Sequence, residues 1–372
     1  MRKEITSLTS LRGFAAMAVI LMHYSATMQP LASGKFPSLA PHGELAVDIF
    51  FILSGFIMAY TYLPSFRTEK GWTAAYWPFL TKRAARILPL NIAVTILLIV
   101  MAMIASWLFR INIFPKVRLT HIPTDLILNA LMLPGIGIGY SINWPAWSIS
   151  VEFLAYFLFP LFLAGVFHQR TTVFLMSCGA ACFLIVLVCA TGNHLSPDGI
   201  HGHYFLPWRD LGRCFSEFVL GLATYRAYAS GRYRTIFRRD AVVFVLLAAI
   251  AAIIGLRLGD LFALFLFPLL ILSLSLNDGR VKAIMAARLP HFLGIISFSL
   301  YLVHDNFRPI AAMIVHALHP APIAPLVAMG LAAMFSVLMI FPAWACYTWI
   351  ERPGRTLLRA LPARIAAKRS AP

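Results

Sequence analysis

Residues 88–109 read LPLNIAVTILLIVMAMIASWLF and contain no charged side chain. At about 1.5 Å of rise per residue, an α-helix of this length spans the roughly 30 Å hydrocarbon core of a bilayer. Similar apolar runs recur along the 372 residues, of which 60% are hydrophobic and only 12% are charged. Soluble domains usually carry about a quarter charged residues. The sequence therefore predicts an all-α membrane protein with its transmembrane helices in one bundle.

About ten transmembrane helices are predicted from these runs. They are placed at 6–28, 45–63, 88–109, 145–167, 171–190, 210–229, 240–257, 259–276, 291–317 and 322–349. With the N-terminus inside, 22 of the 31 lysines and arginines lie in or beside the loops of the cytoplasmic side, and only 6 lie in or beside those of the other side. This asymmetry follows the positive-inside rule and predicts that both termini are cytoplasmic. The net charge of +17 then reflects topology, and we expect membrane lipid but no nucleic acid as a partner.

No composition shift divides the chain into separate domains. Residues 1–350 are predicted to form one transmembrane domain, and 351–372 a basic cytoplasmic tail that could contact anionic lipid. All five cysteines fall in predicted spans, and none has a metal-type spacing with histidine. They are interpreted as small core residues, so neither a disulfide framework nor a bound metal is expected.

Ionisable residues inside the predicted spans are the most informative ones, because each is costly in hydrocarbon. Arg12 and His23 are eleven positions apart in the first span. On an α-helix this spacing puts them on nearly the same face and about 17 Å apart along the axis. A cation and a titratable base at two depths suit a long substrate with a charged end and a reactive end, such as acyl-coenzyme A. The alternative is that Arg12 extends to the headgroups and His23 bonds to a neighbouring carbonyl.

Three further groups fall at a similar depth on this topology: Asp48, Glu152 and His304, each from a different span. Arg213 and Glu217 are four positions apart, and their opposite charges are expected to neutralise each other. Convergence of such groups suits a general base with an orienting carboxylate. It equally suits a proton relay in a transporter, so the residues alone leave both functions open.

Two arginines precede the third predicted span, in the segment KRAARILP. Arg83 and Arg86 are three positions apart and would be neighbours on one face of a helix. Two guanidinium groups at this spacing can hold phosphate with forked hydrogen bonds. The alternative is an ordinary cytoplasmic anchor for the span.

Taken together, these motifs resemble the acyltransferase 3 family of bacterial membrane acyltransferases over nearly the whole chain. The matching segments, in family order, are SLRGFAAMAVILMHY (10–24), VDIFFILSGFIMAY (47–60), RAARILPL (83–90), WSISVEFLAYFLFP (147–160) and SFSLYLVH (297–304). The resemblance implies a ten-helix domain in the bacterial cytoplasmic (inner) membrane. It also implies transfer of an acyl group, usually acetyl, from cytoplasmic acyl-CoA to a hydroxyl of a cell-surface or exported glycan. Acyl-CoA is then a donor substrate, and no permanently bound cofactor is expected.

The resemblance also implies roles for particular residues. His23 is the expected catalytic histidine with Arg12 as its motif partner, Arg83 and Arg86 would bind the CoA phosphates, and Glu152 would be an essential acid.

Three further residues belong to the expected site. Tyr301 and His304 match the late motif without an assigned role, and Asp48 or Glu152 could orient the imidazole of His23. Direct transfer and transient acylation of His23 both remain open. A transporter or flippase for a lipid-linked glycan is the alternative function.

Overall fold

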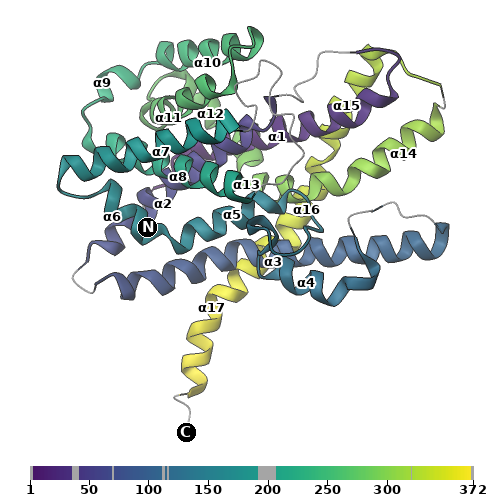
Figure 1. The fold of residues 1–372 in the computed structure, drawn as a ribbon, viewed down its shortest axis with the longest axis horizontal. Coiled ribbons are helices and arrows are strands. Elements are labelled where there is room, and N and C mark those ends of the chain that lie inside the picture. The colour runs from purple at the N-terminus through teal and green to yellow at the C-terminus, as the bar shows by residue number, and fades with distance from the viewer. Residues whose placement is uncertain are drawn as a thin grey trace.

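The computed structural model describes residues 3–35, 42–68, 71–110, 114, 117–191, 207–319 and 321–369. Within these ranges almost all of the chain is helical, and its β-type pairing is an isolated parallel bridge between Ala32 and Ile323. The helices lie side by side in one bundle, from which α17 (Arg352–Arg369) projects (Figure 1). The prediction of an all-helical protein is confirmed.

The helices of the bundle differ greatly in length. Their bounds are α1 (Thr6–Met28), α2 (Leu45–Phe66), α3 (Gly71–Phe109), α4 (Ile122–Ala130), α5 (Ala146–Phe157), α6 (Phe159–Val166), α7 (Thr171–Thr191), α8 (Pro207–Ser230), α9 (Arg234–Phe237), α10 (Asp240–Gly255), α11 (Asp260–Leu276), α12 (Arg280–Met285), α13 (Arg288–Val303), α14 (Arg308–Leu318), α15 (Pro325–Leu338) and α16 (Ile340–Cys346).

Glycines allow two helix pairs at the centre of the bundle to cross closely. Gly55 of α2 packs against the backbone of α8, Gly221 of α8 packs against the backbone of α2, and Gly13 of α1 meets Gly294 of α13. A Cβ atom at Gly221 would lie 2.0 Å from a carbonyl oxygen of α2, and one at Gly294 would lie 2.1 Å from a carbonyl oxygen of α1. Small residues at such crossings are the usual means by which membrane helices approach one another. These two crossings fix the helices that carry the site described below.

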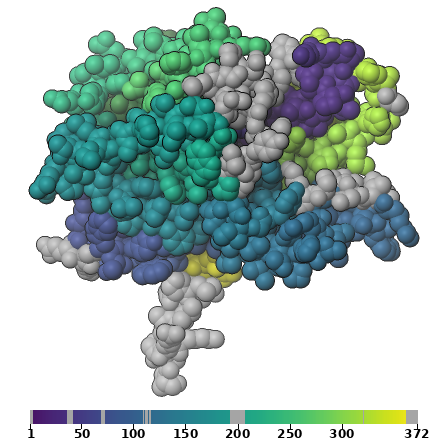
Figure 2. Space-filling model, in the orientation of Figure 1, coloured from purple at the N-terminus to yellow at the C-terminus, as the bar shows by residue number. Residues whose placement is uncertain are grey.

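The outer helices expose apolar side chains, in contrast to the surface of a soluble protein. On α7, Met176 and Phe183 are 73% and 69% exposed. In the space-filling view α10 forms an upper edge of the molecule (Figure 2), where Phe244 and Val245 are 59% and 66% exposed. Helices that are apolar on their outer faces are stable against lipid rather than water. The arrangement is that of a membrane protein.

Length and apolarity identify fewer spans than the sequence predicted. Among the described residues, four helices are long and apolar enough to cross a membrane, or five if the bent pair α5 and α6 is one span. The membrane class is thereby supported. The number of ten spans and the cytoplasmic placement of both termini stay predictions.

One predicted loop is wrong over most of its length. Residues 64–87 were expected to link two spans, but α3 already begins at Gly71 and runs for 39 residues. Pro78 and Pro89 lie inside it, and membrane helices tolerate proline where neighbouring groups satisfy the freed carbonyls. Arg83 and Arg86 therefore project from a continuous helix rather than from a loop.

Three predicted spans are interrupted in ways that periodicity alone does not reveal. The span 145–167 bends by 64° at the break between α5 and α6, because Pro160 in the first turn of α6 cannot continue the hydrogen-bond ladder. The span 291–317 contains a 3₁₀ turn, His304–Phe307, between α13 and α14. The last span ends in a π-helical turn, Tyr347–Glu351, that leads directly into α17.

Candidate active site

A pocket lies between α1, α2, α3, α5 and α13, with about 780 Å³ of empty space that includes its opening to solvent. Five of the predicted site residues line it: Arg12, Arg83, Arg86, Glu152 and Tyr301. The structure thus brings together side chains that are up to 289 positions apart in the sequence. Three guanidinium groups and one carboxylate give the lining an excess of positive charge, as expected for a site that binds an anion.

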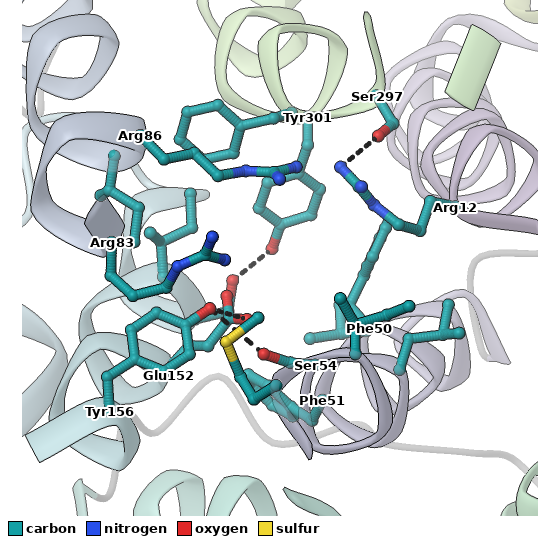
Figure 3. Close-up of a pocket in the computed structure, with 18 residues that line it drawn as sticks. Arg12, Phe50, Phe51, Ser54, Arg83, Arg86, Glu152, Tyr156, Ser297 and Tyr301 are labelled. Carbon is teal, nitrogen blue, oxygen red and sulfur yellow. Dashed lines mark hydrogen bonds between the residues drawn. The ribbon is translucent and has the colours of Figure 1, made fainter. Parts of the chain in front are cut away.

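Arg12 reaches the pocket from the α1–α13 crossing. It donates a hydrogen bond to the hydroxyl of Ser297 at 3.0 Å, and Ser297 in turn donates to the carbonyl of Gly294 at 2.9 Å. Because Gly13 follows Arg12 and meets Gly294, the close crossing sets the position of the guanidinium. Figure 3 shows the guanidinium groups of Arg12 and Arg86 pointing toward each other across the pocket.

Arg83 and Arg86 enter the pocket from the same face of α3. Arg83 is buried and donates to the hydroxyl of Tyr62 at 3.0 Å, with its guanidinium 5.2 Å from the centre of that ring. A second ring, that of Tyr156, lies 6.0 Å from the guanidinium. Nε of Arg83 is buried without a hydrogen-bond partner among the described residues. Aromatic faces hold the cation in place and leave donor capacity for a ligand.

Glu152 lines the pocket from α5. Tyr156, one turn later, donates to its carboxylate at 2.6 Å, and the same hydroxyl is 3.1 Å from that of Ser54 on α2. Ser148, one turn before Glu152, also lines the pocket. Ser148, Glu152 and Tyr156, at i,i+4 spacing on α5, therefore all face the pocket.

His23 and His304 form a pair. Nδ1 of His23 lies 2.8 Å from Nε2 of His304, and the two rings stack with centroids 5.0 Å apart. Nδ1 of His304 lies 2.7 Å from the carbonyl oxygen of Tyr301. His304 is fully buried, whereas His23 is half-buried. The sequence had left His304 without a role, and the structure places it directly against the predicted catalytic histidine.

These contacts determine the tautomers of both rings. A carbonyl can only accept a hydrogen bond, so Nδ1 of His304 carries the proton. In a neutral imidazole the other nitrogen is then an acceptor, and His23 must donate from its Nδ1. The lone pair of neutral His23 is consequently on Nε2. A chain of hydrogen bonds from a backbone carbonyl thus prepares one nitrogen of His23 as a base.

Tyr301 connects this pair to the pocket. Its hydroxyl is 2.7 Å from that of Ser148, and its ring lies 5.9 Å from that of His304. Phe50 of α2 packs edge-on against it at 5.7 Å. The segment 297–304 therefore supplies both Tyr301, which lines the pocket, and His304, which contacts His23.

Asp48 has a different environment from the one expected. Its carboxylate accepts a hydrogen bond from Nε of Arg213 at 2.6 Å, beside a separate cavity that Asp260 also lines. Glu217 is 3.9 Å from the same nitrogen, and Glu44 is 3.3 Å from another nitrogen of the guanidinium. Arg213 is thus shared among three carboxylates: the expected i,i+4 pair with Glu217 is present, but the shortest contact of Arg213 is to Asp48. The observed contacts give Asp48 a role in joining α2 to α8.

Some residues around the site were missed in the sequence. Ser297 accepts a hydrogen bond from Arg12, and Tyr62 accepts one from Arg83. Glu351, which is 1% exposed, accepts hydrogen bonds from Ser299 and Arg355. In the sequence, the sign of Glu351 as a site residue was a lone carboxylate at the end of the last apolar run. Among the described residues, no group of three or more His, Cys, Asp or Glu side chains is arranged to hold a metal ion.

The comparisons with known proteins agree with this geometry. Residues 5–347 match the family described as acyltransferase domain, and the chain belongs to this acyltransferase family. It is similar to an acyltransferase, MdmB, of Streptomyces mycarofaciens, with 32% identity over 164 residues. That match spans 42% of this chain and 39% of the relative. No solved structure matches. The family assignment made from the motifs is confirmed.

Proposed function

We propose that the protein is a membrane-bound O-acyltransferase of the bacterial inner membrane. It moves an acyl group, with acetyl as the first candidate, from cytoplasmic acyl-CoA to a hydroxyl of a cell-surface or exported glycan. The observation that carries this proposal is one continuous arrangement. A pocket with three arginines is joined through Tyr301 to a histidine pair in which Nε2 of His23 is prepared as a base.

The donor is proposed to bind through its phosphates at Arg83 and Arg86. Two guanidinium groups on one helix face can hold phosphate oxygens with several charge-assisted hydrogen bonds. Arg12 lies across the pocket from Arg86 and extends the positive surface toward α1 (Figure 3). The pantetheine arm and the thioester would then occupy the space lined by Phe50 and Tyr301.

The proposed reaction uses His23 as the general base. Its Nε2 removes the proton of the acceptor hydroxyl while the hydroxyl oxygen attacks the thioester carbon. The new C–O bond forms, the C–S bond breaks, and the proton passes from the imidazolium to the thiolate of CoA. His304 holds His23 in the required tautomer, a role that the sequence had given to a carboxylate.

Glu152 is proposed to keep the pocket ordered rather than to hold His23. Its carboxylate offsets part of the charge of the arginines and binds the hydroxyl of Tyr156. A two-step route, in which His23 itself is acylated, uses the same nitrogen and would be revealed by a trapped acyl-enzyme.

The test is release of free CoA from acetyl-CoA by the purified protein in detergent, with candidate glycans supplied. We expect His23→Ala to abolish release, and His168→Ala, which changes an exposed histidine, to leave it unchanged. Arg86→Ala should raise the KM for acetyl-CoA more than it lowers kcat. Equal turnover by wild type and His23→Ala would refute the proposal. Glycan movement in vesicles without thioester cleavage would instead favour a transporter.

A further inference from the structure

A second basic cavity lies where α2, α6 and α8 end, apart from the candidate active site. Its lining includes Leu63, Arg67, Phe167 and Arg226, and its empty space is about 1190 Å³, which includes its opening to solvent. An adjoining cavity of about 750 Å³, its opening likewise included, shares Arg67 and Phe167 and adds Trp72 from the first turn of α3. We call the two cavities together the basic recess. None of its lining residues lines the candidate active site.

The two arginines of the basic recess have no carboxylate partner. The guanidinium of Arg67 lies 5.4 Å from the centre of the Phe167 ring, and that of Arg226 lies 4.2 Å from the centre of the Phe174 ring. Arg226 also donates a hydrogen bond to the carbonyl of Val166. Among the described residues, no Asp or Glu lines the recess and neither arginine forms an ion pair. Aromatic faces hold these cations in place, while their charge stays uncompensated.

Other arginines of the bundle are compensated by carboxylates. Arg308 and Arg355 lie 2.6 and 2.9 Å from carboxylate oxygens one turn away along the chain. Two guanidinium groups that line one cavity without such a partner repel each other. A phosphate between them relieves this repulsion and accepts charge-assisted hydrogen bonds from both. The chemistry of the basic recess is therefore that of a phosphate site.

The recess lies at the level where lipid headgroups are expected. On the predicted topology, α2, α6 and α8 all end on the cytoplasmic side. Trp72 is 48% exposed and Trp77, further along α3, is 67% exposed, and tryptophan is enriched at the interface between membrane and water. Deeper in the bundle, Leu161 of α6 and Leu175 of α7 are 65% and 60% exposed. A basic site at headgroup level next to an apolar surface matches a phospholipid, which is charged at one end and apolar at the other.

We propose that the basic recess binds the phosphate of an anionic phospholipid of the cytoplasmic leaflet, with the acyl chains along α6 and α7. Basic pockets between transmembrane helices on the cytoplasmic side hold anionic headgroups in this way. A zwitterionic headgroup fits less well, because its ammonium group needs a carboxylate and none of the described residues lining the recess provides one. This inference does not depend on the proposed reaction, since the two sites share no residue.

The test is competition between two lipids for the purified protein. The protein in detergent is given equal amounts of phosphatidylglycerol and phosphatidylcholine with the same acyl chains, and native mass spectrometry measures which lipid is retained. We expect the wild type to retain phosphatidylglycerol preferentially. Arg67→Gln/Arg226→Gln should lose this preference, with an affinity for phosphatidylglycerol lower by on the order of tenfold or more. Arg67→Gln alone changes an exposed side chain, should lose part of the preference, and carries the test if the double variant does not fold.

The matched control is Arg232→Gln/Arg234→Gln. It removes the same charge from the segment that follows α8, at exposed side chains that line neither cavity, and should keep the wild-type preference. Equal loss in this control would show a general effect of charge and overturn the proposal, as would equal retention of both lipids by the wild type. Glycerol 3-phosphate presents a phosphate without acyl chains and should not displace the lipid at equal concentration. Displacement would show that the recess takes a soluble phosphate, and would overturn the lipid assignment.

Discussion

Replacing His304 should slow the chemical step without weakening donor binding. In His304→Leu the buried ring is replaced by an apolar side chain, and Nδ1 of His23 loses its acceptor at 2.8 Å. Loss of one partner of a buried hydrogen bond costs about 1–3 kcal/mol. At about 1.36 kcal/mol per tenfold change in rate, kcat should fall roughly 5- to 150-fold. His304→Gln retains an acceptor near the position of Nε2 and should recover part of this loss.

The assay is initial-rate kinetics of CoA release at varied acetyl-CoA, with thermal unfolding in detergent as the check on folding. His304 does not line the donor pocket, so the KM for acetyl-CoA should change less than twofold. A His304→Leu protein that folds normally and keeps kcat within twofold of wild type would refute the tautomer reasoning. An equal loss in the Leu and Gln variants would show that packing, not hydrogen bonding, is what the ring supplies.

Three further predictions concern the packing of the bundle and the role of Glu152. Gly55→Ala should destabilise the protein by several kcal/mol, because the added Cβ would lie 2.0 Å from a backbone oxygen of α8. Gly179→Ala is the control: its Cβ would meet nothing within 4 Å, so the unfolding temperature should not fall. Asp48→Ala should cost about 1.5–3 kcal/mol, because Arg213 loses its closest carboxylate but keeps Glu44 and Glu217. The folded fraction should keep its kcat, and a loss of activity per folded molecule would return Asp48 to the catalytic site. Glu152→Gln should lower activity with a normal unfolding temperature, and unchanged kinetics would remove Glu152 from the site.

The sequence predicted the chemistry of the pocket better than its geometry. Helical spacing put Arg12 and His23 on one face of the first helix, and put Arg83 beside Arg86. Both pairs of positions do lie on continuous helices, α1 and α3. These predictions succeeded because they depend only on the 3.6-residue period, which is local. Glu152, which the predicted spans had placed at a similar depth and the family resemblance marked as an essential acid, lines the pocket as well.

Contacts between helices could not be predicted in the same way. His23 and His304 are 281 positions apart, and nothing in either segment shows that their rings stack. Arg213 was matched with Glu217 because they are neighbours on one helix, yet its shortest contact is to Asp48 of α2. Which of several carboxylates an arginine binds depends on how two helices cross, and a single sequence does not contain that information.

The α1–α13 pair shows how a membrane bundle can position two chemical functions at once. Arg12 contacts Ser297 near the close crossing at Gly13 and Gly294, and eleven residues further along α1 the ring of His23 meets the turn that follows α13. The proposed phosphate-binding end and the proposed proton-transferring end therefore depend on the same helix contact. Without a hydrophobic force between helices in lipid, such a contact must come from close packing and interhelical hydrogen bonds. The glycines that permit the crossing are thus as necessary to the site as the arginine and histidines it aligns.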